Sequence, residues 1–106
     1  MIDVHLLTTD CGELVGFSMR GHAGYGEVGS DIVCAAVSSA AYLVANTVTE
    51  ILHADAQVSV HDSHMAVQIA HRDALICRDI LAGFKLHLLG LEEQYPENIR
   101  VNYLEV

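Results

Sequence analysis

Residues 32–52 are the longest apolar segment of the chain, and Glu50 is their only charged side chain. A helix of about 20 predominantly apolar residues is long enough to cross a membrane. This segment also contains five uncharged polar side chains: Ser38, Ser39, Asn46, Thr47 and Thr49. They favour a core helix and no membrane association. We expect this alanine-rich helix to start after Asp31 as N-cap and to be buried on most sides.

Length and composition limit the fold to one domain. The chain has 106 residues, enough for one compact unit with its own core, so residues 1–106 are expected to form a single domain. Hydrophobic residues make up 52% of the sequence, and it contains one proline. This composition is typical of a packed globule and not of a disordered chain.

The charge and the cysteines indicate where the protein works and what it binds. Five basic and fourteen acidic residues give a formal net charge of −9. This charge disfavours binding to nucleic acid or an anionic membrane and favours a basic partner. Cys11, Cys34 and Cys77 are odd in number and form no C-x-x-C pair, so neither a disulfide framework nor a zinc ribbon is predicted. No basic segment followed by an apolar run opens the sequence, and a reducing cytoplasm is the expected location.

The rest of the chain alternates between strand-like and helix-like patterns. Five segments carry β-forming or alternating apolar residues and are predicted strands: 4–8, 14–19, 56–61, 65–70 and 99–103. Short turn segments predict that the first four strands form two hairpins. Residues 72–94 carry apolar side chains at spacings of three and four, which predicts a second helix with Asp73 as cap. The order ββαββαβ indicates an α+β fold with helices packed on a mainly antiparallel sheet.

Cys34 is the strongest catalytic candidate. It stands in the first turn of the predicted helix, where unpaired backbone N–H groups and the helix dipole favour a thiolate. His22 lies twelve positions upstream, in a glycine-rich stretch that is free to fold back over the helix start. The alternatives are a buried core residue for Cys34 and a surface loop position for His22. Cys11 and Cys77 lack such a setting and are expected to be structural.

Asp31 and Ser38 lie close to Cys34 in the sequence. A carboxylate opposes thiolate formation nearby, so Asp31 is expected to cap the helix, hold the loop or orient His22. Ser38 lies one turn after Cys34 on the same helix face, where its hydroxyl bonds near the thiol or back to a backbone carbonyl. The N–H groups at the helix start are candidate donors to an oxyanion.

Two other kinds of site are suggested by short patterns. Residues 24–29 match G-x-G-x-x-G between a strand and a helix, the arrangement of a dinucleotide site. Antiparallel strands, neighbouring carboxylates and the short chain weigh against that interpretation. His61, His64 and His71 lie close in sequence but have no recognisable ligand spacing, so no metal site is predicted.

The Gly21-His22-Ala23 segment, the loop after it and the Asp31-Ile32-Val33-Cys34-Ala35-Ala36-Val37-Ser38 segment together form a specific pattern. On these residues the sequence resembles the bacterial ribosomal-processing cysteine protease family, known as Prp, over its whole length. The resemblance implies a cytoplasmic, homodimeric endopeptidase that needs no cofactor and removes an N-terminal extension from a protein of the large ribosomal subunit. Cys34 matches the nucleophile and His22 the base. Gly21, Asp31 and Ser38 match other positions of the active-site region.

The acidic chain suits such a substrate, because ribosomal proteins are basic and would be attracted at long range. The alternative is a non-catalytic module that uses the same acidic surface to bind a basic ribosomal protein. Cleavage and its loss on replacement of Cys34 distinguish the two.

Overall fold

A computed structural model describes residues 1–22, 24 and 31–106, which form five strands and two long helices. The elements are β1 (Ile2–Thr8), β2 (Leu14–Arg20), α1 (Ile32–Asn46), β3 (Ala56–His61), β4 (His64–Ile69), α2 (Arg78–Gln94) and β5 (Ile99–Glu105). A π-helical turn, η1 (Thr47–Ile51), extends α1, and a 3₁₀ turn, η2 (His71–Asp73), precedes α2. The predicted ββαββαβ order and α+β class are confirmed.

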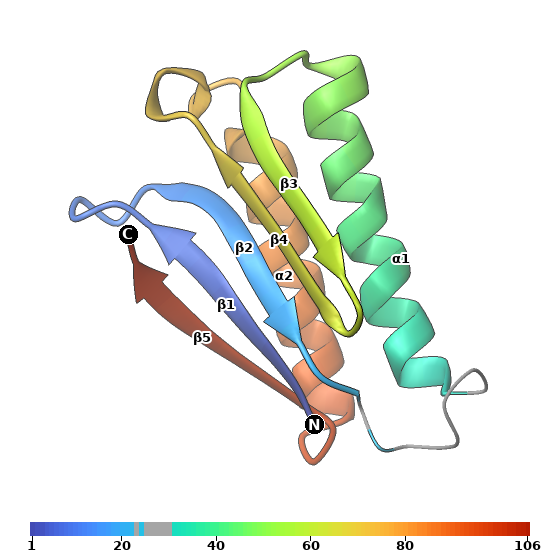
Figure 1. Cartoon of the computed structure of the whole chain (residues 1–106). Helices are drawn as coiled ribbons and strands as arrows, with labels where there is room; N and C mark the ends of the chain where they lie inside the picture. The colour runs from blue at the N-terminus through green and yellow to red at the C-terminus, as the bar shows by residue number, and fades with distance from the viewer. Residues whose placement is uncertain (23, 25–30) are drawn as a thin grey trace.

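The five strands form one sheet in the order β3-β4-β2-β1-β5 (Figure 1). The β1–β2, β2–β4 and β3–β4 pairs are antiparallel, and β1 pairs with β5 in parallel. Both helices pack against the same face of the sheet, so the fold has two layers (Figure 1). A mainly antiparallel sheet was the expectation from the sequence, and only the pairing with the last strand departs from antiparallel.

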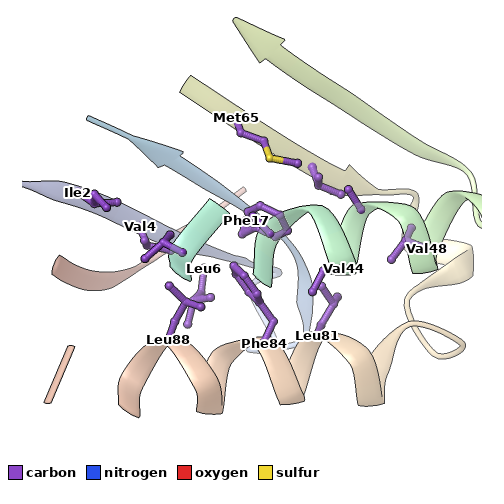
Figure 2. Close-up of a cluster of buried hydrophobic side chains, with 14 of the residues drawn as sticks. Ile2, Val4, Leu6, Phe17, Val44, Val48, Met65, Leu81, Phe84 and Leu88 are labelled. Carbon is purple, nitrogen blue, oxygen red and sulfur yellow. The ribbon is translucent and has the colours of Figure 1, made fainter. Parts of the chain in front are cut away.

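The core lies between the sheet and the two helices. Figure 2 shows Phe17 from β2 facing Phe84 from α2, and their ring centroids are 4.4 Å apart. Alternate residues of β1 point into this core, because successive side chains of a strand face opposite sides of a sheet. Ile2, Val4 and Leu6 are therefore almost fully buried.

The long apolar segment is a core helix, as predicted, but the expectation that it is buried on most sides is wrong. One face of it enters the core through Val33, Val37, Ala41, Val44, Ala45 and Val48. Tyr42 and Leu43 on other faces are 47% and 62% exposed. The reason is that the two helices lie side by side on one face of the sheet, which leaves the outer side of α1 uncovered in a single chain.

By length and composition alone, the continuous helix Ile32–Ile51 would also be able to cross a membrane. In its most apolar stretch of 18 residues, 33% is buried inside the protein. A helix that supplies the core of a globular domain has the same length and composition.

The second helix begins later than the sequence pattern suggests. Its α-helical part starts at Arg78, whereas the prediction began at Arg72 with Asp73 as cap. The Asp73 carboxylate instead accepts a hydrogen bond of 2.8 Å from the backbone N–H of Asp55. This bond holds η2 against the chain before β3, so residues 71–77 form separate turns, and Leu75 is left 70% exposed.

Candidate functional site

A pocket of about 240 Å³ lies where the start of α1, the chain after β2 and the turn between β3 and β4 meet. In Figure 1 these three segments lie toward the same end of the molecule. Four of the five site residues expected from the sequence line this pocket: Gly21, His22, Cys34 and Ser38. The structure therefore brings the thiol and the imidazole to one cavity, although they belong to different elements.

Asp31, the fifth expected residue, caps the helix that carries Cys34. Its carboxylate oxygen Oδ1 accepts hydrogen bonds from the N–H groups of Val33 and Cys34 at 2.9 and 3.0 Å. Its backbone carbonyl accepts from the N–H of Ala35 at 3.1 Å. Asp31 is only 6% exposed, and its extended backbone is typical of an N-cap. The predicted capping role is confirmed.

The cap also bears on where an oxyanion would bind. The sequence made the N–H groups at the helix start candidate donors, but in this structure those of Val33, Cys34 and Ala35 all donate to Asp31. An N–H group that already donates to a carboxylate, as in Val33 and Cys34, or to a backbone carbonyl, as in Ala35, must give up that bond before it can stabilise a substrate oxygen. These three amides are therefore poor donors in the resting arrangement.

Gly21 holds the chain that leads to His22. Its N–H donates to the carbonyl of Ser63 in the β3–β4 turn at 2.9 Å. Its φ of +100° lies in the left-handed region, and a Cβ atom built there would lie 2.4 Å from the carbonyl oxygen of Met1. Both the dihedral angle and the lack of space require glycine. The residue next to it, His22, is thereby placed at the rim of the pocket.

The other two cysteines lie away from this pocket. Cys77 is completely buried, and desolvation, followed by the negative charge of Asp73, raises the pKa of its thiol. Cys11 is exposed in the turn after β1. Their settings agree with the structural interpretation, and Cys34 is the cysteine that lines the pocket.

The histidines considered as metal ligands have different partners. His61 contacts Asp62, His64 contacts Ser18 and His71 contacts Glu13. Within residues 1–22, 24 and 31–106 no group of three or more metal-ligating side chains is close enough to hold an ion. The G-x-G-x-x-G segment at 24–29 lies, apart from Gly24, outside the described residues.

Several pocket residues were not identified from the sequence. Tyr42 lies on the same helix face as Cys34 and Ser38, and the repeated spacing of four was a signal for it. Val60, Asp62, Ser63 and His64 come from the second hairpin, and only the pairing of β4 with β2 brings them here. Met19 and Met65 are brought together by the same pairing, and Ile2 of β1 completes an apolar wall with them.

Comparison with known proteins gives this site its context. A family model described as cysteine protease Prp matches residues 1–100. The chain is 31% identical over 105 residues to the ribosomal processing cysteine protease Prp of Staphylococcus aureus, covering 97% of this chain and 99% of that protein.

Solved structures agree with the sequence match. The S. aureus protease Prp in complex with a covalently linked product peptide is similar with a TM-score of 0.89 at 31% identity, covering 98% of this chain and 100% of that one. The same protease with a substrate peptide gives 0.85 at 30% identity, with the same coverage. SMU.848 from Streptococcus mutans gives 0.80 at 26% identity, covering 100% and 96%.

These similarities extend over almost the whole chain and include the helix, turn and strand that form the pocket. They favour a cysteine peptidase over the alternative of a non-catalytic acidic binding module. The chain belongs to the Prp family of cysteine proteases.

Proposed function

We propose that this cysteine protease removes the N-terminal extension of a protein of the large ribosomal subunit, with Cys34 as nucleophile and His22 as general base and acid. The observation that carries the proposal is that both residues line one pocket, with Cys34 in the first turn of α1. A relative with 31% identity is a ribosomal processing protease and has been solved with a product peptide covalently linked.

The reaction proceeds in two stages. His22 accepts the proton of the Cys34 thiol, and the sulfur attacks the carbonyl carbon of the scissile bond. The C–N bond breaks, His22 protonates the leaving amine, and the acyl group stays on sulfur as a thioester. His22 then activates a water molecule that hydrolyses the thioester and restores the thiol.

The other site residues act by positioning. Asp31 fixes the start of α1 and so the place of Cys34. Gly21 fixes the chain before His22 through its bond to Ser63. Ser38 lies one turn beyond Cys34 at the pocket wall, where its hydroxyl is available to a polar group of the substrate.

The experiment that tests this proposal is cleavage of the purified ribosomal protein precursor, followed by mass. Wild type is expected to remove the extension, whereas Cys34→Ala and His22→Ala are expected to leave it intact. The matched controls are Cys11→Ala, an exposed cysteine outside the pocket, and His71→Ala, whose side chain is 77% exposed and also lies outside it. Both controls should cleave normally. Normal cleavage by Cys34→Ala would refute the assignment of the nucleophile.

We also propose that the enzyme is a cytoplasmic homodimer, as the family resemblance implies. The outer faces of α1 and α2 support self-association, because Leu43 is 62% exposed beside a groove lined by small residues such as Ala36, Ala40 and Gly83. Light scattering coupled to size exclusion measures the mass in solution. Leu43→Glu should shift it toward the monomer, and a monomeric wild type would refute the dimer.

A further inference from the structure

The free edge of the sheet at β3 ends at the catalytic pocket. Among the described residues, β3 is the outermost strand, and it pairs only with β4. The other free edge, at β5, contributes no residue to this pocket. Val60 near the end of β3 and Asp62 in the following turn line the pocket together with Cys34 and His22.

The backbone N–H and C=O groups of every second residue of β3 point away from β4, toward the free edge of the sheet. The carbonyl of Asp55, just before β3, accepts a 2.8 Å hydrogen bond from the N–H of Ala70, just after β4. The register then continues without a shift from Ala56↔Ile69 to His61↔His64. In an antiparallel pair the hydrogen-bonding direction alternates along the strand, so the N–H and C=O groups of Val58 and Val60 are directed to the free edge.

Within the part of the chain that the structure describes, this edge lacks the features that usually prevent strand addition. Proteins protect exposed edges with charged side chains, proline, bulges or a covering element. β3 has the sequence Ala-Gln-Val-Ser-Val-His, its register contains no bulge, and every residue from Gln57 to His61 is exposed. Val58 and Val60 are 43% and 52% exposed, although their cross-strand partners Val67 and Met65 are buried. Residues 1–22, 24 and 31–106 therefore leave an apolar, hydrogen-bonding edge uncovered beside the site.

We propose that the substrate polypeptide binds in extended conformation along β3, adds a strand to the sheet, and is led by this pairing to Cys34. The inference rests on the proposed peptidase function and specifies how that site holds its substrate. A protease must present the scissile bond in an extended chain, and main-chain pairing binds such a chain whatever its side chains. Val60 and Tyr42 in the pocket wall then provide contacts for the apolar side chains of the added strand.

The test is binding of a synthetic peptide that spans the cleavage site of the ribosomal protein precursor, measured by calorimetry with the non-cleaving Cys34→Ala variant. A set of peptides carries one N-methyl group each, at successive backbone nitrogens. N-methylation should weaken binding at every second position, by roughly 3- to 10-fold for each lost hydrogen bond, and leave the positions between them near the unmodified value. Uniform effects, or effects without this alternation, would overturn the proposal.

A variant of the protein tests the same pairing from the other side. Val58→Pro removes an N–H that points to the free edge, a position where an edge strand tolerates proline. It should weaken peptide binding by a similar factor while its melting temperature stays close to that of Cys34→Ala. Asn102→Ala, on the β5 edge that contributes no residue to this pocket, is the control and should bind normally. If Val58→Pro changes only the oligomeric state and not peptide binding, the edge is a self-association surface and the proposal fails.

The strand-addition proposal and the peptidase proposal would be refuted by different results. Loss of the alternation with intact cleavage by wild type refutes strand addition alone. Cleavage that survives in Cys34→Ala refutes the peptidase mechanism, whatever the binding pattern.

Discussion

Gly21→Ala tests how the chain before His22, the proposed base, is held. The new Cβ would lie 2.4 Å from the carbonyl oxygen of Met1, and the dihedral φ of +100° is already unfavourable for alanine. The strained dihedral alone costs about 1–3 kcal/mol. The clash is with backbone, so relief requires moving the Met1–Ile2 peptide, whose N–H bonds Asn98, or moving Gly21, whose N–H bonds Ser63.

Losing one of these hydrogen bonds adds about 1 kcal/mol, which gives a total decrease in the free energy of unfolding of about 2–4 kcal/mol. For a domain near this size, 1 kcal/mol lowers the melting temperature by about 4–8 °C, so we expect a drop of about 8–32 °C. Gly12→Ala is the matched control. Gly12 has a φ of +82° but nothing within 4 Å of the added Cβ, so only the dihedral cost applies.

Thermal unfolding followed by circular dichroism measures both variants, and peptide cleavage is assayed below their melting temperatures. Gly21→Ala should be clearly less stable than Gly12→Ala, and its kcat/KM should fall because His22 is the next residue. If the two variants lose the same stability, the close approach to Met1 does not constrain this segment, and the explanation for glycine at position 21 is wrong.

Four further predictions concern stability and substrate capture. Asp31→Ala should lower the free energy of unfolding by about 1–2 kcal/mol in chemical denaturation, whereas Asp31→Asn, which keeps an acceptor oxygen, should lose much less; equal losses would contradict the capping role. Gly90 lies within α2 outside the proposed dimer groove, and a Cβ there meets nothing within 4 Å, so Gly90→Ala should raise stability by up to about 1 kcal/mol, and a loss would show an unseen clash. The pKa of the buried Cys77 thiol is raised, so the unfolded chain ionises at a lower pH than the folded one. The thiol therefore contributes to stability below its ordinary pKa, and this contribution is lost as pH rises. Cys77→Ala should flatten the decline in stability at alkaline pH, whereas Cys11→Ala should not. The net charge of −9 predicts that added salt lowers kcat/KM for the basic precursor more than for a neutral peptide, and equal salt sensitivity would exclude electrostatic steering.

The sequence predicted the elements of this fold better than their exposure. Patterns of apolar residues located all five strands and α1 because they depend on local periodicity. The late start of α2 was missed because Asp73 bonds the chain before β3, a contact between segments far apart in sequence. The exposure of Leu43 was missed because a helix pattern does not show whether another element covers its second face.

For the site, the motif located Cys34 and Ser38 on α1 and Gly21 and His22 after β2, but not Tyr42 or Met19 on the same elements. It did not locate the wall supplied by Val60 and Asp62, since their place depends on strand order in the sheet. It also did not show that Asp31 occupies the N–H groups that were candidate oxyanion donors. A helix start and its cap can be read from sequence, but the competition between cap and ligand for the same amides requires the structure.

The parallel pairing of β1 with β5 has a consequence for how the enzyme is made. β1 lies between β2 and β5, and its Ile2 bonds Asn98 and lines the catalytic pocket. β5 must therefore reach β1, about 90 residues earlier in the chain, before that wall of the pocket is fixed. Pairings so distant in sequence form slowly, because a long loop must close before any contact stabilises it. A growing chain on the ribosome thus lacks a finished peptidase site until β5 has left the exit tunnel.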